Sequence, residues 1–362
     1  MRTRLAGLAG IALAMAGCAT PPARLAPPPV VVSPLSVAER ARTCRQVGDV
    51  ASIRIDPASA AALAQIGLDR AGIFASMHDT SVPETMGCWA MPTGNFDSQL
   101  VSVGMAQWNF GTGSLQPLLT AWRDRFSSRR AFAAARDAMT PIYGKLLFSK
   151  DCLAVPVTAA CRAGILAAED AKGALGQVLD RELTALFDSD AMLQVQADSY
   201  VALLLKVRDD LLRVFPAGSI SPRKVRWAID TRVQQGALPG DEDIARLRRK
   251  LAAIPAAERA PRLHAIIDWY GALARTIDQD GIAHDAAWNV AAWHCLIDAG
   301  RIDDEQNELL SITFLRSRTA IGNSGRWQAL TFERRATIVL GVGSVSGVRT
   351  GECGTGTGAT GG

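Results

Sequence analysis

The chain has 362 residues and carries 39 lysines and arginines against 35 aspartates and glutamates, a formal net charge of +4. This length is sufficient for one large or two small hydrophobic cores. So small an excess of positive charge gives no reason to expect a polyanionic partner, and nucleic-acid binding is therefore not expected.

The first seventeen residues are expected to be an export signal rather than part of the fold. Arg2 and Arg4 form a cationic start, and the apolar run that follows is too short for a permanent membrane-spanning helix. The run ends at Met15-Ala16-Gly17-Cys18, which resembles the lipobox of bacterial lipoproteins. That resemblance implies acylation of Cys18 and a membrane anchor in the bacterial cell envelope, facing the periplasm. The alternative is an ordinary cleaved signal with an incidental cysteine.

The rest of the chain divides by composition into three parts. Residues 18–37 are rich in proline and are expected to form an extended tether. Residues 38–350 are expected to form the folded domain, without a further apolar run of membrane length. Residues 351–362 are mostly glycine and threonine, have nothing to bury and are expected to be disordered.

Two carboxylates, Glu84 and Asp97, flank a turn-rich segment of the predicted domain. Hydrolysis of a glycosidic bond needs one protonated and one ionised carboxyl group on opposite sides of the bond. Apolar neighbours such as Trp89 suit Glu84 as the general acid, and polar neighbours suit Asp97 as the base. Ser102 could hold the attacking water. The alternative for each carboxylate is an ordinary solvated surface group.

The same segment offers side chains that suit sugar binding. Gln107 and Asn109 could hold sugar hydroxyls, and the indoles of Trp89 and Trp108 could stack on sugar faces. The alternative for Trp108 is a place in the hydrophobic core. Residues 100–110 are the best strand candidate, because turn sequences flank them on both sides.

Helical periodicity dominates residues 118–335. Three apolar stripes are clear, and Pro222 after Ser221 predicts a helix start with Ser221 as its cap. The predicted fold class is therefore mainly α, with one small β element that carries the carboxylates. The stripes are Val201, Leu204, Leu205, Leu211, Leu212 and Phe215; Ile244, Leu247, Leu251 and Ile254; and Leu263, Ile266, Ile267, Tyr270, Leu273 and Ile277.

The six cysteines besides Cys18 are an even number, which fits an oxidising compartment. Cys152 and Cys161 bracket a short loop and are predicted to form a disulfide. The pairing of the others stays open, although Cys88 lies near enough to Glu84 to brace it. No C-x-x-C occurs and the four histidines lack metal-ligand spacing, so no metal and no cofactor are expected.

The pattern Gly94-Asn95-Phe96-Asp97, followed by Ser102 and Gly104, is similar to the hairpin of lysozyme-superfamily chitosanases. The resemblance implies a lysozyme-like, two-lobed helical fold with a small β-hairpin at the active-site cleft. It also implies that Asp97 is the general base, that Ser102 positions the water where threonine is more usual, and that Glu84 is the general acid. Residues 104–107 are also similar to the Gly-Leu-Met-Gln motif of lytic transglycosylases, which share this fold.

Two later segments extend the resemblance. Residues 228–236 are similar to a chitosanase helix that carries an aspartate, and residues 334–347 resemble the C-terminal segment of bacterial proteins with the same hairpin. We expect Asp230 to be structural, either as a cap or as the partner of Arg334 or Arg335.

Taken together, these features predict an envelope-anchored glycoside hydrolase that cleaves a β-1,4-linked amino-sugar polymer by inverting acid–base chemistry. Acidic residues are not concentrated around the hairpin, as binding of the cationic polymer chitosan would require. The predicted location therefore favours the glycan strands of peptidoglycan. The alternative is a lipoprotein with the same fold that binds glycan or acts as a scaffold without catalysis.

Overall fold

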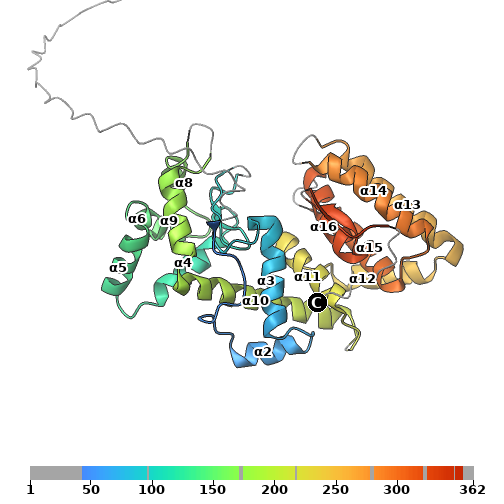
Figure 1. Ribbon diagram of the computed structural model, residues 1–362, viewed down its shortest axis with the longest axis horizontal. Coiled ribbons are helices and arrows are strands. Elements are labelled where there is room, and N and C mark those ends of the chain that lie inside the picture. The colour runs from blue at the N-terminus through green and yellow to red at the C-terminus, as the bar shows by residue number, and fades with distance from the viewer. Residues whose placement is uncertain are drawn as a thin grey trace, which may run out of the picture. The chain divides into compact units, whose positions relative to one another are not determined.

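The computed structural model describes residues 43–95, 98–170, 174–216, 218–277, 281–320, 324–345 and 347–353. All of them belong to one compact unit, Ser36–Gly362. Helices dominate this unit, which confirms the prediction of a mainly α protein (Figure 1). The predicted export signal, the tether, Cys18 and Asp97 lie outside the described residues, as does most of the glycine-rich tail.

The first half of the unit contains nine helices and a hairpin within the described residues, and its last helix is the longest. These elements are α2 (Pro57–Ala64), α3 (Arg70–Thr85), β1 (Ser102–Val103), β2 (Trp108–Asn109), α4 (Leu115–Asp124), α5 (Arg129–Met139), α6 (Gly144–Leu147), α7 (Lys150–Leu153), α8 (Ala159–Leu166), α9 (Gln177–Phe187) and α10 (Asp190–Val214).

The second half is a helical bundle that ends in a second hairpin. Its elements are α11 (Pro222–Gln235), α12 (Asp241–Ala252), α13 (Ala256–Ala274), α14 (Ile282–Asp298), α15 (Asp304–Ser317), α16 (Gly325–Leu340), β3 (Gly343–Val345) and β4 (Val348–Thr350). The helix start predicted at Ser221 is confirmed, because its side chain accepts a hydrogen bond from the backbone N–H of Lys224.

Two hydrophobic cores fill the unit, and α10 contributes to both. One core joins α2 and α3 to the bundle of α11–α16, and the other lies among the β1–β2 hairpin, α4 and α6–α9. Met192 of α10 packs in the second core, whereas Leu204 packs in the first. Trp108 of β2 contacts both cores. The hairpin and the end of α3 therefore lie where the two cores meet.

The predicted apolar stripes are largely correct. Leu204, Leu211, Ile267 and Tyr270 are completely buried. The prediction that Leu212 belongs to the buried stripe is wrong, because this residue is 38% exposed. The helical period places it on the edge of the stripe, and nothing in the bundle covers that edge enough to bury it.

Three disulfides link the described cysteines. Cys152–Cys161 is confirmed as predicted. Cys44–Cys88 fastens the segment that follows α3 to the start of the described chain, and Cys295–Cys353 ties the second hairpin to α14. No helix among the described residues is long and apolar enough to cross a membrane.

Candidate active site

Glu84 lies in the last turn of α3, the helix that leads toward the first hairpin. The prediction of one β element that carries both carboxylates is therefore wrong for Glu84, and the described residues contain two hairpins rather than one. The side chain of Asp69 caps the start of α3, and Met86 ends the helix with a left-handed backbone conformation. On the flank of α3, the hydroxyl of Tyr200 in α10 bonds to the hydroxyl of Thr80 at 2.7 Å and donates to the carbonyl of Ser76. These buried contacts hold α3 against α10 and so help to set the position of Glu84.

Two donors bind the same oxygen of the Glu84 carboxylate. Arg334 Nη1 donates to Oε1 at 2.8 Å, and Gln234 Nε2 donates to the same atom at 2.9 Å. The Glu84 side chain is 18% exposed, so it is held firmly yet remains accessible to solvent. Because both donors bind Oε1, the contacts orient Oε2 without occupying it.

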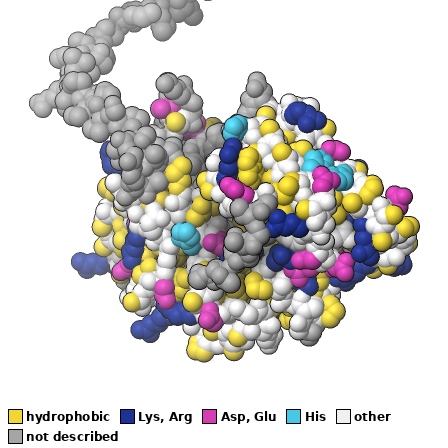
Figure 2. Space-filling view, turned by 45° about the vertical axis from the view of Figure 1, so that its right-hand side comes forward, with side chains coloured by type: hydrophobic (Ala, Val, Ile, Leu, Met, Phe, Trp, Pro, Cys, Tyr) yellow, Lys and Arg dark blue, Asp and Glu magenta, His cyan; other side chains and the backbone are white. Residues whose placement is uncertain are grey.

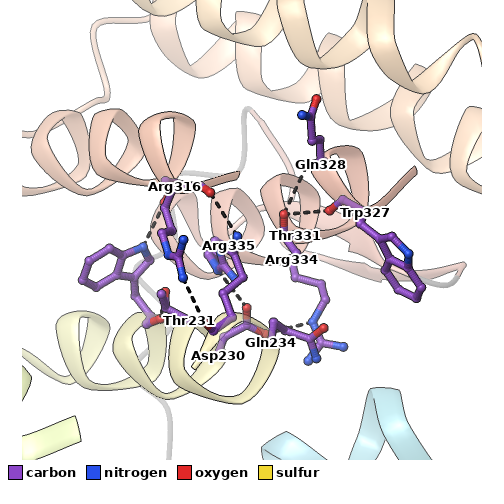
Figure 3. Close-up of polar contacts among 12 residues, drawn as sticks. Asp230, Thr231, Gln234, Arg316, Trp327, Gln328, Thr331, Arg334 and Arg335 are labelled. Atoms are coloured by element: carbon purple, nitrogen blue, oxygen red, sulfur yellow. Dashed lines mark hydrogen bonds and ion pairs between the residues drawn. The ribbon is translucent and has the colours of Figure 1, made fainter. Parts of the chain in front are cut away.

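Arg334 joins Glu84 to Asp230, and Arg335 joins the same aspartate from the other side. Arg334 Nε donates to Asp230 Oδ2 at 2.8 Å, and Arg335 Nε donates to Oδ1 at 3.2 Å (Figure 3). The prediction that Asp230 pairs with Arg334 or Arg335 is confirmed, and it pairs with both. We call Glu84, Asp230, Gln234, Arg334 and Arg335 the carboxylate–guanidinium network.

The charges of the two arginines respond differently to their surroundings. Burial opposes the charge of Arg334, yet its pKa is raised because Asp230 and Glu84 outweigh that burial. Burial dominates at Arg335 and lowers its pKa to about 10, although Asp230 acts in the opposite direction. Arg334 is thus the cation that the network stabilises.

The end of α11 is held by a further arginine. Arg316 of α15 donates from Nη2 to the carbonyl of Gln235 at 2.8 Å and from Nε to the carbonyl of Ala237 at 3.0 Å. Burial lowers the pKa of Arg316. This clamp fixes the turn of α11 that presents Gln234 to Glu84 (Figure 3).

The hairpin brings Ser102 and Gln107 together through Thr93. Ser102 is almost fully buried and exchanges both backbone hydrogen bonds with Thr93. Gln107 accepts a hydrogen bond from the Thr93 hydroxyl at 2.9 Å and donates to the carbonyl of Met91 at 3.0 Å. The side-chain amide of Gln107 therefore fixes Met91 and Thr93, which precede the predicted base in the sequence.

Two residues that begin the next described segment have an unusual backbone conformation. Ser98 and Leu100 both have positive φ angles, 66° and 70°, which non-glycine residues rarely adopt. The side chain of Asn95 accepts a hydrogen bond from the N–H of Leu100 at 2.8 Å. Strained backbone of this kind is concentrated at functional sites.

The predicted sugar-binding residues differ in what they contact. Trp89 is completely buried, so both faces of its ring are covered and it belongs to the core; we do not retain it as a stacking surface. Asn109 accepts hydrogen bonds from the N–H and the hydroxyl of Thr112, both at 2.8 Å, and so fixes the turn after β2. Trp108 is half-buried between the two cores.

A pocket of about 420 Å³ lies beside the network, between α3, α11 and α16. Asp230 and Arg334 line it, so the pocket and Glu84 share the same guanidinium. The apolar residues Val82, Ile229 and Ile338 line much of the rest. Glu84 and the residues of the β1–β2 hairpin do not line this pocket, so its only link to the proposed acid is the shared side chain of Arg334.

The sequence predicted Glu84 as a candidate acid and Asp230 as a structural residue. It did not predict that Gln234 and Arg334 bind Glu84. Among the described residues, no group of three or more His, Cys, Asp or Glu side chains could hold a metal ion. No known family model, curated protein or solved structure matches the chain.

Proposed function

We propose that the protein is a glycoside hydrolase with a lysozyme-like fold, which cleaves a β-1,4-linked amino-sugar polymer. The favoured substrate is the glycan strand of peptidoglycan, and the favoured location is the bacterial envelope, with a lipid anchor at Cys18. The observation that carries the proposal is the placement of Glu84, a partly exposed carboxylate held on one oxygen by Arg334 and Gln234.

In the proposed mechanism Glu84 is the general acid. The ion pair with Arg334 is made by the ionised carboxylate, so Glu84 must take up a proton before it can act as the acid. We assign that proton to Oε2, because Arg334 and Gln234 both bind Oε1, and from Oε2 it passes to the glycosidic oxygen. Because the hydrogen bonds to Oε1 already hold the Glu84 carboxyl group in place, Oε2 loses little further freedom when the substrate binds. Such pre-positioning of a catalytic group lowers the entropic part of the barrier.

The base of the reaction is assigned to Asp97, with Ser102 beside the attacking water. The support for this assignment is the resemblance of the hairpin to that of chitosanases, together with the strained backbone at Ser98 and Leu100. The hydrogen bond between Thr93 and Gln107 also supports the assignment, because it fixes the chain just before the segment that carries the proposed base.

Digestion of purified peptidoglycan and, separately, chitosan by the purified chain tests the reaction class. We expect new reducing ends from peptidoglycan and few or none from chitosan. Asp97→Asn should lower the rate by about 10²–10⁴, the usual contribution of a general base. Glycan cleavage without new reducing ends, undiminished in Asp97→Asn, would indicate a transglycosylase, which closes an anhydro ring in place of adding water and needs no water-activating base. Glycan binding without cleavage would favour the scaffold alternative.

A further inference from the structure

Two histidines face each other on the surface where α13 packs against α14. His264 of α13 and His294 of α14 meet edge to edge, with ring centroids 4.8 Å apart and Nδ1 atoms 2.5 Å apart. Each ring is partly exposed, with 28% and 25% of the side chain accessible. Neither helix contributes to the carboxylate–guanidinium network, so this pair is separate from the proposed active site.

The outer nitrogens of the two rings determine their tautomers. His264 Nε2 lies 3.0 Å from Asp298, and His294 Nε2 lies 3.0 Å from Asp268. A carboxylate only accepts hydrogen bonds, so each Nε2 carries a hydrogen. In neutral rings both Nδ1 atoms then present lone pairs toward each other. Two lone pairs at this distance repel unless a cation lies between them.

We propose that His264 and His294 form a binding site for a divalent transition-metal ion of the class that imidazole prefers, such as Zn²⁺. Histidines that bind metal almost always donate their other N–H to a carboxylate, which fixes the ring and raises its basicity. Here both rings do so, each toward an aspartate on the opposite helix. The supporting contacts of a metal site are therefore already in place.

The site would have two protein ligands, with water in the remaining positions. Zinc–nitrogen bonds of about 2.0–2.1 Å and tetrahedral angles place two ligand nitrogens about 3.3 Å apart. The Nδ1 atoms must therefore move apart by about 0.8 Å, and the rings must tilt until both lone pairs point at the metal. The partial exposure of the rings leaves room for this movement. Asp268 and Asp298 are about 70% exposed and can follow the rings. Figure 2 shows a place on the surface where histidine and acidic side chains adjoin.

A metal bound there would cross-link α13 and α14. Because it would bind the folded chain more tightly than the unfolded chain, it would stabilise the protein by an amount that rises with the logarithm of the metal concentration above the dissociation constant. The proposal does not depend on glycan cleavage, and its test uses no glycan.

Calorimetric titration of the chelator-treated full chain with zinc chloride tests the proposal. We expect one Zn²⁺ per chain, with a rise in melting temperature as zinc is added. Binding should be lost in His264→Gln and in His294→Gln, and retained in His284→Gln, which changes an exposed histidine of the same α14. Asp268→Asn should weaken binding about 10–100-fold through its effect on His294.

Circular dichroism without zinc establishes that each variant is folded. Should either histidine variant fail to fold, Asp268→Asn and Asp298→Asn carry the test, because both side chains are largely exposed. If the parent chain does not bind zinc, the proposal is overturned. The cation between the two rings is then a shared proton. Binding that survives in both histidine variants would also overturn the proposal.

Discussion

Arg334 lies between two carboxylates, those of Glu84 and Asp230, and bonds to each at 2.8 Å. Its side chain is 14% exposed and that of Asp230 is 7% exposed, so solvent does little to screen either charge. Removing one partner of such a pair leaves the other charge buried and uncompensated. The stability of this region therefore depends on Arg334 more than on surface ion pairs.

We predict that Arg334→Gln lowers the free energy of unfolding by about 3 kcal/mol. The matched control is Arg226→Gln, which breaks a pair with Asp79 in which both side chains are more than half exposed. The control should change stability by less than about 0.5 kcal/mol. Urea denaturation of both variants measures the difference, and equal effects would refute the role given to Arg334.

Glu333 predicts a pH dependence of stability. It is almost completely buried, and burial raises its pKa from 4.5 to about 8, with Asp285 acting in the same direction; the hydrogen bond from Tyr270 opposes the shift. The folded state thus keeps a proton that the unfolded chain loses above its ordinary pKa. The stabilisation is complete below pH 4.5 and is lost progressively as the pH rises toward 8.

Glu333→Gln should remove this contribution, because glutamine keeps an oxygen that can accept the hydrogen bond from Tyr270 but has no proton to lose. Urea denaturation at a series of pH values between about 4.5 and 8 measures it. The parent chain should become less stable relative to the variant as the pH rises. Parallel curves for the two proteins would show that Glu333 does not hold the proton.

Among single residues, the sequence predicted the pairing of Asp230 with Arg334 or Arg335, and the structure shows both pairs. The catalytic role of Glu84 stays a prediction. Trp89 was predicted to stack on sugar and is instead completely buried. Whether an indole faces solvent depends on which segments cover it, and those segments are distant in sequence.

Among the elements, the first hairpin shows how a local pattern can mislead about strand length. Residues 100–110 were predicted as a strand, but only Ser102–Val103 and Trp108–Asn109 pair. Gly104 and Gln107 have positive φ angles of 85° and 50°, so the chain reverses between them. The flanking turn sequences on which the prediction rested mark the ends of the segment and do not reveal a turn inside it.

Gly104→Ala should therefore destabilise the hairpin by about 1–3 kcal/mol. A Cβ there would lie 2.7 Å from the ring of Trp108 and 2.9 Å from Oε1 of Gln196. Gly300→Ala is the control, because its φ is also positive, at 65°, yet a Cβ would meet nothing within 4 Å. Thermal melts compare the two, and a control as damaging as Gly104→Ala would show that crowding at the hairpin is unimportant.

The disulfides differ in the length of chain that they close. Cys44–Cys88 spans 44 residues and Cys152–Cys161 spans nine. Loop-closure entropy predicts that replacing the first pair with serine costs about 4 kcal/mol and the second about 3 kcal/mol. Urea denaturation of the two double variants measures this order, and the reverse order would contradict the entropic explanation.

Across the whole molecule, helical periodicity was sufficient to predict the fold class, because buried helix faces repeat regularly. It did not predict that α10 would contribute to two cores, nor that Glu84 would pair with an arginine 250 residues away. Such a pairing depends on how α3, α11 and α16 pack together. The surface mixes acidic and basic side chains (Figure 2), in keeping with the small net charge.

We propose that Glu84 is the acid of a glycosidase, and a comparison of cleavage rates among three chains tests this role. Reducing ends released from purified peptidoglycan are measured for the parent chain, Glu84→Gln and Glu308→Gln. Glu308 is a matched control, because it is 24% exposed and paired with Arg248, away from the network. We predict a loss of about 10²–10⁴ in Glu84→Gln and full activity in the control. Undiminished cleavage by Glu84→Gln would contradict the assignment.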